Sequence, residues 1–413
     1  MPKWQLWYLR HGGQRRYRGV CRSGHGQDRV GDVRDLRHGS IISARPRRLT
    51  PSITPRETVK PLLTSRIHAV TAVMGLCLLL TGAVMYAAQE TDGLRYDPAN
   101  IVGAERCSEC HEPAVDQWET TSHYKTFNGA DDVEAMHRRE AAAETLDNLG
   151  ERSAKRGVCT NCHYTMQAEE AGGRPRANYG VSCESCHGAA ADWVEEHGVY
   201  GEDASGAKRT RETEPDDHRE ARLTTAEAGG MIRTDNPYAL IQNCFQCHTV
   251  PNELLVNTGG HQAGSDFNIL EWLAKEVRHN YLYSDGAENR AAPRDMDAVA
   301  RSRVLLVLGE IIDVEYGLRG LASATTDGPF AEGLMARIAA GVEALEAIRA
   351  AEPAMAATLD TVLAAVAGAD LGPNNRPALL AAAETVGSAA RSFSESEDGA
   401  GLGGLDALMP GAP

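Results

Sequence analysis

Eight cysteines of this 413-residue chain fall into four copies of one pattern: two cysteines separated by two residues and followed at once by a histidine. The remaining two cysteines, Cys21 and Cys77, precede the first copy. A pattern that repeats in full four times indicates one shared chemistry rather than unrelated thiol pairs. The four copies are Cys107/Cys110 with His111, Cys159/Cys162 with His163, Cys183/Cys186 with His187, and Cys244/Cys247 with His248.

Covalent attachment of haem c explains this spacing. Two thiols three residues apart can each add to one vinyl group of a haem, and the histidine that follows then binds the iron as its proximal ligand. A zinc ribbon needs no histidine after each thiol pair, a thioredoxin-like redox pair occurs once beside a βαβ pattern, and structural disulfides do not repeat one pentapeptide. We therefore expect four haem c groups, held by these eight cysteines, with His111, His163, His187 and His248 as metal ligands.

Six further histidines after residue 88 could bind the opposite face of an iron. His123 lies in a helical stretch twelve residues after His111, and His197 follows His187 by ten residues. His279 lies near the end of the helical stretch 269–283. These three are predicted to be distal ligands. The other three lie among charged residues or glycines and are predicted to be exposed to solvent; they are His137, His218 and His261.

Haem c is attached outside the cytoplasm, so an export signal is expected. Residues 67–88 are uncharged and largely apolar, and Arg56, Lys60 and Arg66 precede them, which is the arrangement of a signal peptide. The segment is also long enough to span a bilayer and has a poor cleavage pattern, so a removed signal peptide and an inner-membrane anchor both stay open. Residues 1–66 predict either a disordered basic extension or a misplaced start, with the true start near Val59.

Charge is divided unevenly along the chain. Residues 1–68 contain 15 Lys/Arg against 4 Asp/Glu, and the remaining residues contain 27 against 53, a net charge of −26. So acidic a body repels phosphate backbones, which argues against a nucleic-acid partner and favours a positively charged protein partner.

The elements that must hold the motifs are predicted to be mainly α-helical. Residues 89–290 contain all four copies with little continuous hydrophobic periodicity, as expected of a loop-rich cytochrome domain whose haems form much of the core. Apolar residues recur at helical spacing over 291–393, for example at Leu334, Ile338 and Leu345, and predict an all-α bundle. The bundle serves docking or oligomerisation, or simply packs on the haem domain. The Gly-rich residues 394–413 are predicted to be disordered.

The surroundings of the motifs resemble those of the tetrahaem cytochrome c-554 family over about residues 97–284. The resemblance rests on Arg106 before the first copy, Trp118 and His123 after it, and GVSCESCHG at 180–188 with His197 beyond. It implies haems in stacked pairs and distal ligands exchanged between motifs. His197 would then complete the iron of His111, His123 that of His187, and His279 that of His248, which leaves the distal face of the His163 iron open.

Two functions from different classes stay open. The first is a periplasmic multihaem electron carrier that transfers electrons between a donor and an acceptor redox protein. The alternative is an oxidoreductase acting on nitric oxide, hydroxylamine or a similar molecule at a five-coordinate haem bound by His163. Stacking of subunits into a haem filament is a third, weaker hypothesis.

Overall fold

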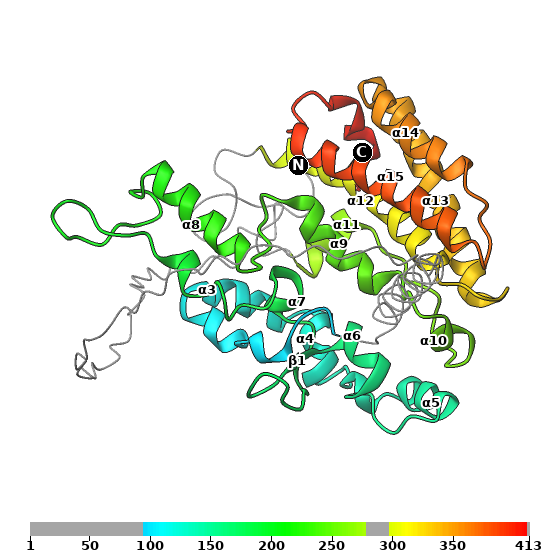
Figure 1. The fold of residues 1–413 in the computed structure, drawn as a ribbon, viewed down its shortest axis with the longest axis horizontal. Helices are drawn as coiled ribbons and strands as arrows, with labels where there is room; N and C mark the ends of the chain where they lie inside the picture. Colours follow the sequence, from blue (N-terminus) through cyan, green and yellow to red (C-terminus); the bar gives the residue numbers. More distant parts are fainter. Residues whose placement is uncertain (1–93, 278–296, 411–413) are drawn as a thin grey trace, which may run out of the picture. The chain divides into compact units, whose positions relative to one another are not determined.

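The computed structural model describes residues 94–277 and 297–410, and these residues are mainly α-helical (Figure 1). This confirms the predicted fold class. The predicted segments 1–66 and 67–88 lie outside the described residues, as do His279 and the predicted boundary at residue 290. The α-helices before the gap are α3 (Ala104–Glu119), α4 (Ser122–Asn128), α5 (Glu140–Leu149), α6 (Thr160–His163), α7 (Cys183–His187), α8 (Asp216–Ala228), α9 (Pro237–His248), α10 (Glu253–Asn257) and α11 (Ile269–Lys275).

Short elements connect these helices. The strands β1 (Thr165–Gln167) and β2 (Arg176–Tyr179) pair antiparallel, with Met166 opposite Ala177. The structure also contains short 3₁₀ helices, which are η1 (Pro98–Asn100), η2 (Met136–Arg138), η3 (Gly157–Cys159), η4 (Glu196–Gly198), η5 (Pro353–Met355) and η6 (Gly403–Leu408).

Each motif forms one helical turn. Three of the motif histidines are the last residues of their helices, α6, α7 and α9, and His111 lies where α3 leaves helical geometry two residues before Pro113. Positions i, i+3 and i+4 lie on the same face of a helix. A helical turn therefore presents both cysteines and the histidine of each motif to the same side.

A four-helix bundle follows the gap. Its helices are α12 (Ala298–Leu321), α13 (Pro329–Ala351), α14 (Ala356–Ala367) and α15 (Arg376–Ser396). The central helix α12 contacts α13, α15 and also α9, and most of its residues are buried, as expected of a helix that others surround. Two of these helical segments begin with a proline, which is favoured in a first turn: Pro353 opens η5, which leads into α14, and Pro377 lies in the first turn of α15.

The bundle and the fourth motif share one hydrophobic core. Ile241 and Phe245 of α9 are each 1% exposed and pack in the same cluster as Leu305, Leu308 and Ile311 of α12. Two smaller clusters lie elsewhere, one around Tyr164 and Met166 and one around Trp193. The bundle is therefore built onto the helix that carries His248.

The segment after α15 differs from the predicted disorder. Leu402 and Leu405 are buried against the bundle, and Arg303 of α12 binds the Asp406 carboxylate with an Nε to Oδ1 distance of 2.7 Å. Two leucines three residues apart are enough to dock this Gly-rich segment, because each buried leucine contributes about 2 kcal/mol.

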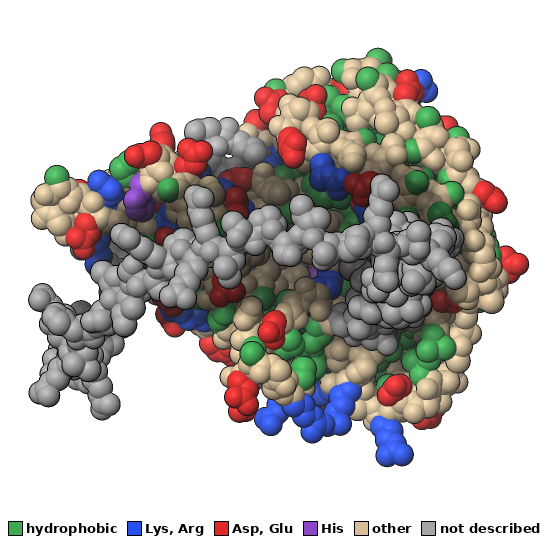
Figure 2. Space-filling view, in the orientation of Figure 1, with side chains coloured by type: hydrophobic (Ala, Val, Ile, Leu, Met, Phe, Trp, Pro, Cys, Tyr) green, Lys and Arg blue, Asp and Glu red, His purple; other side chains and the backbone are tan. Residues whose placement is uncertain are grey.

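Among the described residues, no single helix has the length and apolar composition of a bilayer span. Only α13 taken together with Pro353–Ala367 meets that test, and the two pieces meet at a bend of 119°. Figure 2 shows acidic side chains scattered over the visible face, whereas a group of Lys and Arg side chains gathers along the edge near α5 and α6.

Candidate haem-binding sites

Three pairs of histidine rings face each other across gaps of nearly equal size. Two imidazoles that share one metal, at about 2.0–2.1 Å per bond, have ring centres roughly 6.3 Å apart. The ring centres of His111 and His197 are 6.2 Å apart, and the other two pairs are each separated by 6.3 Å. In every pair one ring belongs to a motif and the other comes from a different segment, so each gap suits an iron held between a proximal and a distal histidine.

The first pair joins α3 to η4. His111 faces His197, whose ring also packs edge-on against Trp193. This is the pairing that the resemblance implies for the first motif. Arg222 of α8 supports η4 by donating a hydrogen bond from Nη1 to the backbone oxygen of His197.

The second pair differs from expectation. His261 lies on the loop after α10, and its ring faces His163 at the end of α6. His261 was predicted to be exposed and the distal side of His163 to be open, but the structure places an imidazole there. The sequence favoured exposure because the neighbouring Gly259, Gly260 and Gly264 are typical of a solvent-exposed loop. In the structure His261 is partly exposed.

The third pair also differs from expectation. His123 of α4 faces His248 at the end of α9, whereas the resemblance paired His123 with His187 and His248 with His279. Trp272 of α11 lies against both rings, with ring centres 6.1 Å from His123 and 4.9 Å from His248. An aromatic wall from α11 thus closes this site.

No histidine ring faces His187 within residues 94–277 and 297–410. The imidazole of His187 is held by Nδ1, which lies 2.9 Å from the backbone oxygen of Ile232. The predicted ligand His279 falls in the segment that the structure does not describe.

Hydrogen bonds at Nδ1 orient four of these rings. Besides His187, the Nδ1 atom of His197 lies 2.7 Å from Val194 O, that of His248 lies 2.8 Å from Ser265 Oγ, and that of His261 lies 2.9 Å from Gln262 O. Metal-bound histidines characteristically donate their second ring N–H to such an oxygen, which fixes the tautomer. The same tautomer leaves Nε2 unprotonated, with a lone pair available to a metal.

Burial keeps the candidate ligands neutral. Desolvation, followed by the neighbouring cations, lowers the pKa of His163 to about 4 and that of His248 to about 3. It also lowers the pKa values of His123, His187 and His197. A neutral imidazole has the free lone pair that a metal requires.

The cysteines bring the motifs together in two pairs. The thiols of Cys107 and Cys183 shift each other's pKa, and so do those of Cys162 and Cys247. In agreement with this, α3 contacts α7 and α6 contacts α9. The first motif therefore lies beside the third and the second beside the fourth. The third and fourth are also neighbours, since α7 packs on α9 and Asn243 donates a hydrogen bond of 3.0 Å to Cys186 O.

Cys110 of the first motif differs from the prediction. It was expected to attach a haem, but in the structure it is disulfide-bonded, whereas the other seven motif cysteines are free thiols. A cysteine sulfur forms one bond beyond its own Cβ, so a disulfide and a thioether to a haem vinyl group exclude each other. Such a bond is chemically reasonable for an exported chain, because oxidising compartments favour disulfides. In this state Cys107 is the one thiol of its motif that could attach a haem.

A buried carboxylate inside the third motif joins it to the first. Glu184 is 2% exposed and accepts hydrogen bonds of 2.9 Å from the backbone N–H groups of Val102, Gly103 and Ala190. Sequence reasoning missed this residue, because a glutamate between two motif cysteines is typical of a solvent-facing position. Its three backbone partners fix the start of α3 against α7.

The remaining two histidines lie apart from the ring pairs. His218 is about one-third exposed and binds the buried Glu214, which also pairs with Arg222. Burial opposes ionisation of Glu214, but the hydrogen bonds from Arg222 and His218 hold its pKa below the usual value. His137 lies near Phe127, and its buried Nδ1 has no hydrogen-bond partner.

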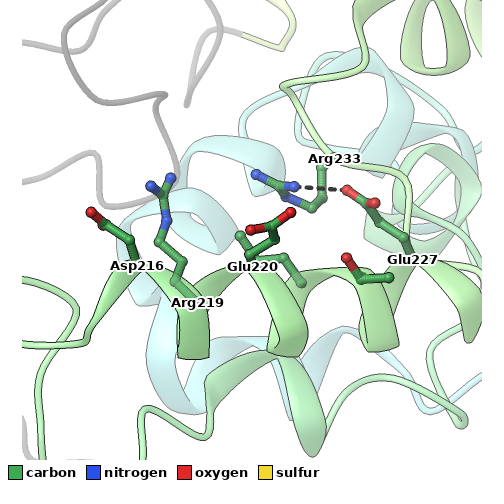
Figure 3. A pocket seen from close by; sticks show the side chains of 7 residues that line it. Asp216, Arg219, Glu220, Glu227 and Arg233 are labelled. Carbon is green, nitrogen blue, oxygen red and sulfur yellow. Dashed lines mark hydrogen bonds and ion pairs between the residues drawn. The ribbon is translucent and has the colours of Figure 1, made fainter.

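A surface pocket on one side of α8 is unrelated to these residues (Figure 3). Its walls are mainly charged, and Arg233 bridges to Glu227 across it with an N to O distance of 2.7 Å. It contains none of the motif residues or ring pairs. Nor do any three histidine, cysteine or acidic side chains converge as zinc ligands would in the part of the chain that the structure describes.

Comparison with known proteins agrees with the motif geometry. The family described as "Cytochrome c554 and c-prime" matches residues 106–188, which contain the first three motifs. Over these residues the chain is similar to the cytochrome c-554 family. Cytochrome c-554 from Nitrosomonas europaea is 25% identical to this chain over 143 residues, which are 32% of this chain.

The alignment spans 57% of the length of that cytochrome c-554. No solved structure matches the chain. Similarity to a c-type cytochrome family favours covalently bound haem. The seven free motif thiols and the three ring pairs suit that group, and Cys110 suits it once its disulfide is reduced. The bundle lies outside the matched family region, so its role must be argued from this structure.

Proposed function

We propose that the protein is a periplasmic multihaem c-type cytochrome that transfers electrons between a donor and an acceptor redox protein through four covalently bound haems. The observation that carries this proposal is the set of three facing histidine pairs, each with the ring separation of a six-coordinate iron. Iron with two histidine ligands exchanges single electrons, and its potential is set by ligation, burial and nearby charge.

The proposed ligand set follows from the ring pairs. The four motif histidines would be proximal ligands, held on the same helical face as their cysteines. His197, His261 and His123 would be the distal ligands opposite His111, His163 and His248. His279 stays a proposed ligand from the sequence alone.

Attachment of the first haem through both cysteines requires Cys110 as a thiol. The disulfide at Cys110 must therefore be reduced before the second thioether forms, by exchange with an external dithiol that becomes a disulfide in its place. With the disulfide in place, this haem would be held by Cys107 alone. Pyridine haemochrome spectra distinguish the two cases, because a haem that keeps one vinyl group absorbs at longer wavelength than one that has lost both.

The order of the motifs in space supports a carrier. Neighbouring sites follow the order first, third, fourth, second, because α3 contacts α7, α7 contacts α9, and α6 contacts α9. A continuous series of neighbouring sites is what stepwise electron transfer requires. The oxidoreductase alternative needs an open face at His163, and the ring of His261 occupies that face.

The test is the cofactor content and ligation of the purified, exported protein. Intact-mass and pyridine haemochrome analysis should give four covalently attached haems per chain. Electron paramagnetic resonance should show low-spin ferric iron at the three paired sites. Bound zinc in place of haem, or high-spin iron at all of these sites, would overturn the proposal.

A further inference from the structure

One short segment serves two of the candidate iron sites. Residues 253–265 run from α10 to Ser265 and carry His261, which faces His163. Ser265 lies 2.8 Å from Nδ1 of His248 through its Oγ atom, and its backbone N–H donates to His248 O at 3.0 Å. The same segment therefore supplies a ligand to the second site and orients the ligand of the fourth.

This segment is poorly suited to hold itself in place. Beyond one helical turn it contains Gly259, Gly260 and Gly264, and the last of these has a φ of +82°. Glycine loses more conformational freedom on ordering than other residues. Contacts from outside the segment therefore contribute to the position of His261 and Ser265.

The bundle contacts the start of the segment through Glu253. Its carboxylate accepts hydrogen bonds from the backbone N–H groups of Thr325 and Thr326, at 3.0–3.1 Å, and from both of their hydroxyls, at 2.7 and 2.9 Å. These threonines lie in the turn between α12 and α13. A hydrogen bond to a charged acceptor is stronger than a neutral one.

A second contact lies at the start of α13. Asn257 Oδ1 accepts a hydrogen bond of 3.0 Å from the backbone N–H of Phe330. Further along α13, a Cβ atom at Gly333 would lie 2.5 Å from the Cβ of Ala263. Only a glycine at this position lets the helix approach the loop so closely, two residues from His261.

A third contact reaches Ser265 itself. Arg337 of α13 donates from Nη1 to the backbone oxygen of Ser265 at 2.8 Å, and its Nε binds the carboxylate of Asp313 on α12. Both side chains are largely buried, with 12% and 16% of their surfaces exposed. The bundle core thus fixes the guanidinium of Arg337, and Ser265 connects that guanidinium to His248.

We infer that the helical bundle is a clamp that holds residues 253–265 on two haem sites, with Glu253 and Arg337 as positioning residues for His261 and His248. The inference rests on the proposed function and deepens it, since it assigns the bundle a role in haem ligation. The three contacts are distributed along the segment, at its start, its middle and its end. Within the segment, the His261 N–H donates a hydrogen bond of 3.2 Å to Leu255 O, which ties His261 to α10, and the three contacts tie the segment to the bundle.

The experiment compares Thr325→Val/Thr326→Val and Arg337→Gln with a control, Arg349→Gln, in the full-length, haem-loaded protein. Arg349 lies on the same helix but pairs with Asp360 at the surface. The threonine variant should raise the high-spin fraction of the second site by roughly tenfold, because losing a group that supports a metal ligand typically changes metal affinity by about that factor. Arg337→Gln should change the midpoint potential of the fourth site alone, and Arg337→Lys should restore it in part.

Hydrogen exchange gives an independent readout. Amides of residues 253–265 should exchange faster in the threonine variant than in the control. The threonine variant should fold, because it leaves no buried charge unpaired. The clamp is refuted if spin states, potentials and exchange rates in these variants equal those of Arg349→Gln. Failure of the wild-type protein to show low-spin haem would instead refute the proposed function.

Discussion

Sequence and structure differ most over His261. Its neighbours in the sequence predict a solvent-exposed residue, whereas its position opposite the ring of His163 is that of a distal ligand. Replacing it with alanine should leave the iron of His163 without its distal ligand. We expect His261→Ala to convert one site from low-spin to high-spin, visible in the optical spectrum, and added imidazole to restore the low-spin form by filling the vacated position.

His218→Ala is the matched control for this prediction. His218 binds Glu214 and faces no motif histidine among the described residues, so its loss should leave the spin states unchanged. Equal spectra for the two variants would show that the ring of His261 does not bind iron.

A buried carboxylate on α12 should make stability depend on pH. Burial, and then the neighbouring Asp313, raise the pKa of Glu310 to about 7 from its ordinary 4.5. Between these values the folded protein holds a proton that the unfolded chain has lost. The free energy of unfolding must therefore fall as pH rises through this window.

Glu310→Gln removes this titration. The stability of the wild-type protein relative to the variant should fall between about pH 4.5 and pH 7 and become constant above it. Urea unfolding of both proteins across this range measures the difference. Parallel stability curves would contradict the prediction.

The junction of α9, α12 and α15 depends on one fully buried side chain, Glu315. Its carboxylate accepts hydrogen bonds from Tyr238 of α9 at 3.0 and 3.1 Å and from Arg319 Nε at 2.8 Å. Arg391 of α15 reaches the same tyrosine hydroxyl at 3.0 Å. Removing one partner of a buried pair leaves the others unsatisfied.

We expect Glu315→Ala to lower the free energy of unfolding by about 3 kcal/mol. Glu384→Ala is the control, because Glu384 binds Arg319 and Arg391 at the surface and its loss should cost about 0–1 kcal/mol. Denaturant unfolding followed by circular dichroism separates the two. An equal cost would mean that α9 is held by apolar contacts alone.

The whole chain after residue 68 carries a net charge of −26, and this charge should govern encounters with redox partners. A cation is attracted and an anion repelled, and salt screens both effects. The rate constant for electron transfer with hexaammineruthenium should therefore fall as ionic strength rises. That for ferricyanide should increase, and stopped-flow absorbance measures both.

The same salt response for both reagents would contradict this prediction. It would mean that a local surface, such as the group of basic side chains near α5 and α6 in Figure 2, controls access instead of the total charge.

Sequence alone determined the type of chemistry and the fold class. Each haem motif is complete within five residues because a helical turn brings positions i, i+3 and i+4 to one face. The bundle was equally predictable, since Leu334, Ile338 and Leu345 repeat at helical spacing and are buried as expected. Local geometry settles such features before any tertiary contact forms.

The sequence of a motif does not determine the bonding of each of its cysteines. Cys110 has the same motif as its three counterparts, yet it alone of the eight motif cysteines is in a disulfide. A disulfide needs a second sulfur within bonding distance, and the five residues of a motif do not specify which distant segment approaches it.

Only the tertiary structure decided which rings meet. His261 follows His163 by 98 residues, and His123 precedes His248 by 125, so no local rule connects them. The glycines around His261 are typical of an exposed loop, and the sequence does not show that α13 packs against that loop. The resemblance assigned His123 to the iron of His187, because it compares residues along the chain and not contacts in space. Long-range packing supplies the burial that makes a histidine a ligand, and that packing is absent from any single segment.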